Sequence, residues 1–338
     1  MGIFAVAAAA VWIAGIYVAR TTDTLSKKLG LGQALGGIIV LAIVTNLPEV
    51  AITVSAALSG EVGVAVDNIL GGIAIQTVVL VALDAFGLGR QNSLTYQTAS
   101  LVPVLEGALV IAMLATAVMG SQLPSTLLLG RVTPTGLLLL VLWVLGTWLI
   151  GRASKGLPWQ PKDAPGSQQE PDSEQDKQQK ASTARMVLVF TVSALVTLAA
   201  GVVLERSGEH LAKNLGLGGA VFGATVLAAA TSLPELSTGL ASIKQKQYEL
   251  AMGDIFGGNA FLPVLLLLAG IVSGKAVLPL ASKLDVYLTG LGALLTSVYL
   301  YGLIMRPKRQ VARMGLDSLA VLLLYALGVL GIVAIGSH

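Results

Sequence analysis

The sequence predicts an all-α integral membrane protein whose ten transmembrane helices form two inverted five-helix repeats. Three observations lead to this prediction. Of the 338 residues, 55% are hydrophobic and only 12% are charged, and the mean hydropathy is +0.82. Ten apolar runs are each close to the roughly 20 residues that a helix needs to cross a bilayer. The second half of the chain also repeats short motifs of the first half at one constant spacing.

The ten apolar runs are expected to be helices because a segment exposed to lipid must satisfy its own backbone hydrogen bonds. A cleaved signal peptide is the alternative for the first run, but this run lacks a basic start and is long, which favours a retained span. In order, the runs lie at residues 2–19, 33–59, 62–88, 94–118, 126–150, 186–204, 216–243, 248–273, 278–304 and 314–335.

A polar segment separates the fifth run from the sixth. Residues 152–184 are rich in Pro, Gln, Ser and charged residues, which predicts a solvated, disordered linker. Its acidic cluster, EPDSEQD, lacks the glycine and the ligand spacing of an EF-hand calcium loop. The linker divides the chain into residues 1–151 and 185–338, each with five spans.

Basic residues are distributed unequally between the two sides that these spans imply. The side that carries the linker holds all but five of the 21 Lys and Arg residues. The five on the other side are Arg131, Arg206, Lys213, Lys275 and Lys283. Because basic loops tend to stay in the cytoplasm, the linker is predicted to be cytoplasmic and both termini outside. The expected location is the plasma membrane.

Three motif pairs share one offset of 186 residues along the chain. LSKKLGLG at 25–32 matches LAKNLGLG at 211–218, TNLPE at 45–49 matches TSLPE at 231–235, and NILGG at 68–72 matches DIFGG at 254–258. Matches at one constant spacing indicate an internal duplication. Since each copy holds an odd number of spans, the two copies enter the membrane in opposite directions, which is typical of secondary transporters with a site near the bilayer midplane.

Each copy places polar residues on one helical face beside a proline. Pro48 and Pro234 donate no backbone hydrogen bond, so the carbonyl groups of Val44 and Ala230 lose their helical partners. Carboxylate, hydroxyl, amide and free carbonyl oxygens are the ligands of a hard cation such as calcium, which takes six to eight oxygens at about 2.3–2.6 Å. The residues of this face, spaced i, i+3, i+4 and i+7 in each copy, are Ala42, Thr45, Asn46 and Glu49, and Ala228, Thr231, Ser232 and Glu235.

The following spans hold Asn68 and Asp254 at equivalent positions. Each is followed three residues later by a glycine pair, Gly71–Gly72 or Gly257–Gly258, which is expected to let helices approach closely. A lone buried glutamate can have a structural role. Two glutamates placed symmetrically beside prolines indicate function, because a charge inside the membrane costs at least about 3 kcal/mol.

With the motifs TNLPE…NILGG and TSLPE…DIFGG, the chain resembles the sodium/calcium exchangers of the cation/calcium antiporter superfamily. The resemblance covers both repeats but not the linker. It implies an antiporter that exchanges calcium for sodium by alternating access, without a cofactor, and in which the first and sixth spans are moving gate helices. It also implies a ligand set: Glu49 and Glu235 at the centre, Thr45 and Thr231 beside them, the carbonyl groups of Ala42 and Ala228, and Asn68 and Asp254 at the middle position.

The driving ion stays open between sodium and protons. Asn46 stands where sodium-coupled members have a serine, and Val64 and Leu250 replace hydroxyl residues of their sodium site. Burial also favours the neutral form of a carboxyl group, so a proton-coupled cation antiporter is the alternative. Ser232 and the intact TSLPE motif favour sodium, and Asn46 and Ser232 complete the predicted ligand set.

Four other acidic residues are weaker candidates. Asp67 adjoins Asn68 but points about 100° away from it on a helix. Asp84 and Asp285 lie near span ends and are expected to contact water. Glu106 has no partner in the other repeat, and it stays open between a structural role and an auxiliary proton site.

Other classes of protein are disfavoured. The chain has only two histidines, no HExxH motif and no P-loop, which argues against the commoner metal and nucleotide enzymes. AMGD at 251–254 only partly matches the Gly-x-Gly-Asp of intramembrane aspartyl proteases, because Ala251 occupies the first glycine position. No basic stripe for nucleic acid is present, so the predicted partners are the lipid bilayer and the transported cations. A passive cation channel differs from an exchanger only in flux coupling, and the oligomeric state is not predicted.

Overall fold

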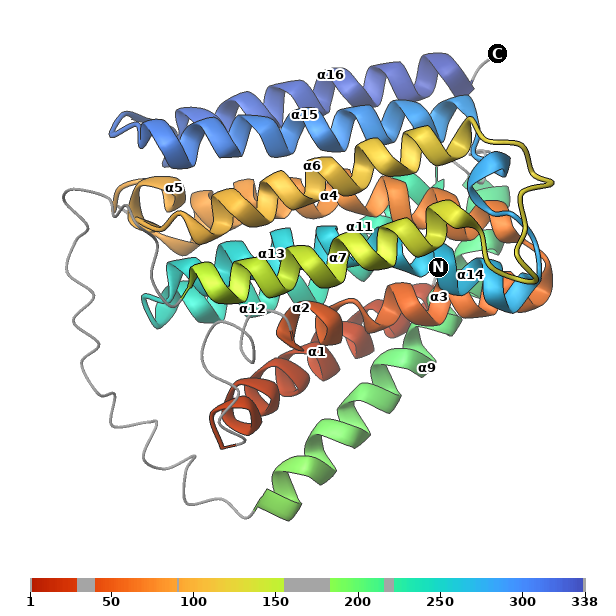
Figure 1. The fold of residues 1–338 in the computed structure, drawn as a ribbon. Coiled ribbons are helices and arrows are strands. Elements are labelled where there is room, and N and C mark those ends of the chain that lie inside the picture. The colour runs from red at the N-terminus through yellow and green to blue at the C-terminus, as the bar shows by residue number, and fades with distance from the viewer. Residues whose placement is uncertain (1, 29–39, 90, 155–182, 216–221, 337–338) are drawn as a thin grey trace.

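The chain folds into an almost entirely helical bundle (Figure 1). The computed structural model describes residues 2–28, 40–89, 91–154, 183–215 and 222–336. The first half contains α1 (Gly2–Lys28), α2 (Val40–Thr45), α3 (Leu47–Ser59), α4 (Val62–Gly87), α5 (Leu94–Gln97), α6 (Val102–Ser121) and α7 (Pro134–Ala153). The second half contains α9 (Thr183–Leu215), η2 (Gly223–Leu227), α11 (Ala228–Thr231), α12 (Leu233–Lys244), α13 (Tyr248–Phe261), η3 (Leu262–Val264), α14 (Leu265–Ser273), η4 (Leu278–Leu280), α15 (Lys283–Met305) and α16 (Leu316–Gly336).

The number of membrane spans is confirmed only in part. Among the described residues, seven helices are long and apolar enough to cross a membrane, and the bent pair Thr225–Thr231 and Leu233–Lys244 makes an eighth. Two shorter apolar helices are Leu47–Ser59 and Leu316–Ile332. The predicted second span does not count by these criteria, because a break at Asn46 shortens it and residues 29–39 lie outside the described ranges.

The loop after α15 departs from the predicted all-helical fold. There, β1 (Gln310–Val311) and β2 (Met314–Gly315) pair as a two-stranded antiparallel hairpin. The carboxyl group of Asp84, at the end of α4, accepts hydrogen bonds from the backbone N–H groups of Gly315 at 2.6 Å and Leu94 at 2.7 Å. The prediction that Asp84 contacts water is therefore wrong. Its side chain is buried, because it satisfies backbone donors of two loops.

Two predicted features fall largely outside the described residues. The structure describes only the edges of the linker 152–184, since α7 ends at Ala153 and α9 begins at Thr183. The motif pair LSKKLGLG and LAKNLGLG also extends beyond the described ranges.

The helices form a central group with a separate pair along one flank. Figure 1 shows α15 and α16 at one side of the bundle and α1 and α9 next to each other at the opposite side, with α4 and α13 between these flanks. A large apolar core joins α4, α6, α13 and α15. A second, smaller core joins α1 and α9 through Val11 and Leu204, and it reaches α3 at Ile52. The α1–α9 pair is thus a packing unit of its own on the side of the bundle.

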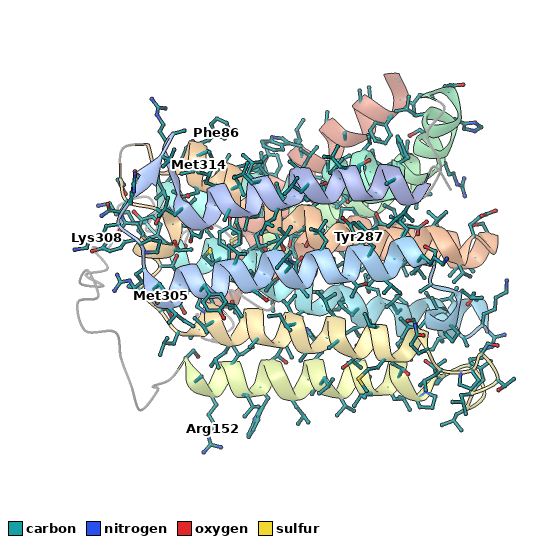
Figure 2. All side chains as sticks on the ribbon, turned by 90° about the horizontal axis from the view of Figure 1, so that it is seen from above. Phe86, Arg152, Tyr287, Met305, Lys308 and Met314 are labelled. Carbon is teal, nitrogen blue, oxygen red and sulfur yellow. The ribbon has the colours of Figure 1, made fainter. Side chains whose placement is uncertain are left out.

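Arg152 and Lys308, two of the basic residues that were predicted to be cytoplasmic, lie at one end of the bundle. Figure 2 shows Arg152, Lys308 and Met314 together at this end, whereas Tyr287, near the start of α15, lies in the other half. Large apolar side chains such as Trp148, Leu195 and Leu327 are exposed on the outer faces of α7, α9 and α16, as expected of helices that face lipid.

Candidate functional site

Two broken helices bring the predicted ligands into the interior. The first is interrupted at Asn46, between α2 and α3, and the second at Ser232, between α11 and α12. Each break comes just before a proline, Pro48 or Pro234, at the second position of the new helix. Because proline has no backbone N–H, the helical ladder cannot continue through it, and the second pair bends by 45°. The sequence predicts a lost backbone hydrogen bond at each proline within one continuous span, whereas the structure breaks the helix at both places.

All ten predicted ligand residues are buried in the described structure, and none is more than 2% exposed. They are Ala42, Thr45, Asn46, Glu49, Asn68, Ala228, Thr231, Ser232, Glu235 and Asp254. Buried polar side chains usually have hydrogen-bond partners. The hydrogen bonds that each of these side chains makes therefore indicate which of its oxygens are free to bind a ligand.

Asp254 joins the two repeats. Its Oδ1 atom accepts a hydrogen bond at 3.1 Å from the hydroxyl group of Thr45, which belongs to the other half of the chain. Its Oδ2 atom accepts a hydrogen bond from the hydroxyl group of Thr238 on α12. Asp254 thus stands between the two broken helices, with both carboxyl oxygens hydrogen-bonded.

The two glutamates are much less well satisfied. Oε1 of Glu49 accepts a hydrogen bond at 3.4 Å from the side-chain amide of Gln76, whereas Oε2 has no partner, and neither carboxyl oxygen of Glu235 has one. Glu235 lies within electrostatic range of both Glu49 and Asp254. No basic side chain of the described ranges is paired with any of the three. The interior therefore holds three neighbouring carboxyl groups without a protein cation to balance them.

The threonine of each repeat lies beside the glutamate of the other repeat. Thr45 lies beside Glu235 and Thr231 lies beside Glu49, although neither hydroxyl donates a hydrogen bond to that glutamate. This exchange of neighbours is the arrangement expected of two inverted copies that meet face to face. Each glutamate is thus flanked by a hydroxyl group of the opposite copy.

Asn68 is also unsatisfied. Both polar atoms of its side-chain amide are buried and make no hydrogen bond to the described chain. A free amide oxygen inside a membrane protein is costly unless a ligand engages it. The amide oxygen of Asn68 is therefore not engaged by the described chain, and its role as a ligand stays a prediction.

The carbonyl groups of Ala42 and Ala228 are occupied in this conformation. The carbonyl of Ala42 accepts hydrogen bonds from Thr45 Oγ1 at 3.2 Å and Asn46 Nδ2 at 2.6 Å. The carbonyl of Ala228 accepts hydrogen bonds from Thr231 Oγ1 at 3.1 Å and from Ser232 Oγ at 2.7 Å. No group of three or more Asp, Glu, His or Cys side chains in the described ranges is gathered tightly enough to hold a metal ion. A cation held here has to take hydroxyl, amide and carbonyl oxygens as well as carboxylates.

Sequence reasoning missed Gln76 and Thr238. Gln76 is fully buried on α4 and donates hydrogen bonds to Asn46 Oδ1 at 3.0 Å and to Glu49. It follows Asn68 by eight residues, which is close to the same helical face, and Thr238 follows Glu235 by three. Extending the polar face by about two turns in α4 and by about one turn in α12 finds both residues.

Gly258 provides space for the first helix break. A Cβ atom at this position would lie 2.5 Å from Nδ2 of Asn46, so only glycine leaves the amide in place. At Gly72, by contrast, a Cβ atom would meet only Leu262, at an ordinary 3.7 Å. The predicted role of the glycine pairs in close approach is thus supported at Gly258 and not at Gly72.

Gly258→Ala is expected to lower the apparent calcium affinity by about tenfold. Moving Asn46 breaks its bonds to Ala42 and Gln76, each worth about 1 kcal/mol, and 1.4 kcal/mol corresponds to a factor of ten. Initial rates of radiolabelled calcium uptake over a range of calcium concentrations measure this change. Gly290→Ala is the matched control, because no atom lies within 4 Å of the Cβ position there. An unchanged affinity in Gly258→Ala would show that Asn46 does not support the site.

Glu106 lies beside a separate small cavity. Its carboxyl group is 2% exposed, with one oxygen unpartnered. It lines a cavity of about 20 Å³, enough for one water-sized occupant, together with Ala42, Trp143, Thr147 and Gly257.

The chain is similar to one described protein family, to a bacterial membrane protein and to solved structures of cation exchangers. A family model described as sodium/calcium exchanger protein matches residues 1–151 and 185–334. The inner membrane protein YrbG of Escherichia coli is 26% identical over 263 residues, which is 77% of this chain and 76% of that protein. The solved structure of the H+/Ca2+ exchanger CAX has a TM-score of 0.72 at 13% identity, covering 99% of this chain and 84% of its own. That of the sodium-calcium exchanger NCX_Mj has a TM-score of 0.63 at 17% identity, covering 97% of both chains.

Proposed function

Since the chain belongs to the sodium/calcium exchanger protein family, we propose that it exchanges calcium for sodium through the interior site formed by Glu49, Glu235, Asp254 and Asn68. The family consists of exchangers, so the chain is a multi-pass membrane antiporter of cations and not an enzyme. The ion pair that it exchanges, and the residues that bind these ions, are the proposal.

One observation carries the proposal. The two repeats meet at a hydrogen bond between Thr45 and Asp254, beside two glutamates with three unpartnered carboxyl oxygens between them. Carboxylates that lack a basic partner inside a membrane require a cation or a proton. Calcium, with its preference for six to eight oxygens, suits carboxylate, hydroxyl and amide groups drawn from both copies.

The proposed topology has ten spans, with the loops near Arg152 and Lys308 in the cytoplasm and both termini outside. The helix directions support it, because α7 and α15 end, and α16 begins, at the end that carries Arg152 and Lys308 (Figures 1 and 2). The proposed location is the plasma membrane. Inverted repeats allow alternating access, because each copy closes one side of the same site.

Proton coupling is the alternative to sodium coupling. Solved structures of similar fold include an H+/Ca2+ exchanger as well as a sodium-calcium exchanger. Asn46, where sodium-coupled members have a serine, uses its amide to bind Ala42 and Gln76, which leaves one fewer hydroxyl for sodium. Ser232 and both threonines keep hydroxyl groups in the site and favour sodium.

Calcium uptake into proteoliposomes under imposed gradients tests the proposal. We expect an outward sodium gradient, at equal pH on both sides, to drive calcium uptake well above the rate in liposomes without protein. An imposed pH gradient without sodium should drive less. Uptake driven by the pH gradient alone, with none driven by sodium at any pH, would replace sodium by protons as the coupled ion.

A further inference from the structure

The segment between α15 and α16 gathers positive charge at the end of the bundle that is proposed to be cytoplasmic. Residues 306–316 include four basic residues and no acidic one. The neighbouring acidic residues, Asp84 and Asp317, are buried, and their carboxyl groups accept backbone hydrogen bonds. The outer side of the segment therefore carries positive charge. Its basic residues are Arg306, which is partly exposed, and Lys308, Arg309 and Arg313, which are exposed.

Large apolar side chains are exposed next to these charges. Met305, in the last turn of α15, is 76% exposed, and Phe86, in the last turn of α4, is 80% exposed. Figure 2 shows both residues at the same end as Lys308 and Met314. Exposed apolar groups beside cations suit the surface of a bilayer, where apolar groups enter the hydrocarbon and cations meet phosphate groups. The arrangement favours a lipid partner over a soluble anion.

Tyr96, on the short helix α5, holds two of the cations in place. The guanidinium group of Arg306 lies 4.8 Å from the centre of the Tyr96 ring, and Nζ of Lys308 lies 5.9 Å from it. Arg306 Nη2 also donates a hydrogen bond at 2.9 Å to the carbonyl group of Tyr96. Contacts between cations and aromatic rings are attractive, and tyrosine is frequent at the level of lipid headgroups. The two cations are thus arranged around the ring before any ligand binds.

The hairpin of β1 and β2 is fastened to α4 and to the loop that follows it. The backbone N–H of Gly315 donates a hydrogen bond at 2.6 Å to the carboxyl group of Asp84. The side-chain amide of Gln310 donates one, also at 2.6 Å, to the carbonyl group of Gln91. A surface that is fixed in advance loses little conformational entropy when it binds a ligand. The hairpin therefore presents its charges in a preformed arrangement.

We propose that this face binds the headgroup of an anionic phospholipid of the cytoplasmic leaflet. The phosphate group of such a lipid is negatively charged, and guanidinium and ammonium groups bind its oxygens. The acyl chains of the lipid then meet the apolar edge. The proposal depends on the proposed topology only for the leaflet that supplies the lipid. The hairpin surface consists of Tyr96, Arg306, Lys308, Arg309 and Arg313, with Phe86 and Met305 at its apolar edge.

Lipid binding to the full chain in detergent tests the hairpin surface. Native mass spectrometry with dioleoyl phosphatidylglycerol or dioleoyl phosphatidylcholine, which share their acyl chains but differ in net charge, gives the affinity for each lipid. We expect the unmodified chain to prefer phosphatidylglycerol by at least about tenfold, because each basic residue near an anionic headgroup adds to the attraction. Lys308→Gln/Arg309→Gln/Arg313→Gln should lose this preference. The three side chains are exposed, so this variant should fold normally.

A matched control removes the same charge elsewhere at the same end of the bundle. Arg152→Gln/Lys244→Gln/Lys246→Gln replaces three exposed basic residues. Lys244 and Lys246 lie at the end that carries the hairpin, because the hydroxyl group of the nearby Tyr248 donates a hydrogen bond at 3.0 Å to Gln91. This variant should keep the preference for phosphatidylglycerol.

Two further measurements test whether the partner is a lipid or a free phosphate group. Phe86→Ser/Met305→Ser keeps every charge and should bind phosphatidylglycerol at least about threefold more weakly, because contacts with the acyl chains are lost. Glycerol phosphate, which is anionic but has no acyl chains, should not displace phosphatidylglycerol at equal concentration.

Several results would overturn the hairpin surface. No preference in the unmodified chain, or a preference that survives Lys308→Gln/Arg309→Gln/Arg313→Gln, would show that these charges do not bind the lipid. Equal loss in the control variant would make the preference a general property of the basic end. Displacement by glycerol phosphate, or unchanged binding in Phe86→Ser/Met305→Ser, would show a site for a free phosphate group. None of these measurements involves ion transport, so they succeed or fail independently of the interior site.

Discussion

Glu49→Gln and Glu235→Gln are each expected to lower calcium transport by at least about 100-fold. Removing one charge from a buried pair of opposite charges typically costs about 2–5 kcal/mol, and each 1.4 kcal/mol is a factor of ten. Glutamine has nearly the same shape as glutamate, so the helices should pack unchanged. The unpartnered oxygens of both glutamates mean that no protein hydrogen bond beyond that from Gln76 is lost.

Calcium uptake by purified, reconstituted protein measures the effect of these variants. Glu61→Gln is the matched control, because Glu61 is exposed just before α4 and should transport normally. Elution as a single species in size-exclusion chromatography and an unchanged helical circular dichroism signal would show that each variant is folded. Near-normal transport in either glutamate variant would exclude it from the site.

Gly15→Leu and Gly201→Leu are expected to lower the turnover rate by at least about tenfold while calcium binding persists. A Cβ atom at Gly15 of α1 would lie 2.8 Å from Cβ of Pro234, and one at Gly201 of α9 would lie 3.0 Å from the backbone of Pro48. Each glycine thus rests on the proline of the opposite repeat. If α1 and α9 move across the broken helices, a larger side chain obstructs the movement, since overpacking a tight interface costs about 1–3 kcal/mol.

Comparison of binding with turnover separates obstruction of movement from damage to the site. Dialysis with radiolabelled calcium should give nearly unchanged affinity in Gly15→Leu and Gly201→Leu, while exchange rates fall. Gly290→Leu, at an open position of α15, should change neither. Unimpaired turnover in both variants would argue against α1 and α9 as moving helices.

The sequence contains the central features of the fold and the site. Pro48 and Pro234 predict the lost hydrogen bonds at which the helices break, because a missing N–H is a local property that needs no knowledge of packing. The offset of 186 residues also holds for pairs that the motif comparison did not use. Gly15 and Gly201 make equivalent contacts with Pro234 and Pro48, and Asn259 donates a hydrogen bond to the carbonyl group of Ile73, its equivalent position in the other repeat. These pairs show that the two halves repeat in space as well as in sequence.

Other features depend on contacts that no local pattern reports. Asp84 and Asp285 look like water-exposed residues at span ends, yet a loop and a helix cap bury them. Gln76 appears unremarkable in an apolar helix until α3 brings Asn46 and Glu49 next to it. The carbonyl groups of Ala42 and Ala228, which the family resemblance implies as ligands, accept hydrogen bonds from neighbouring side chains, because an unoccupied acceptor in the interior costs free energy.

Exchange of calcium for calcium tests the central claim most directly, since it requires the interior site and alternating access but no particular driving ion. Proteoliposomes are loaded with unlabelled calcium and placed in radiolabelled calcium, without a sodium or pH gradient. We predict rapid uptake of label by the unmodified chain and by Glu61→Gln, and none above protein-free liposomes for Glu49→Gln or Glu235→Gln. Equal uptake of label by the glutamate variants and the unmodified chain, or no uptake by the folded unmodified chain, would contradict the account.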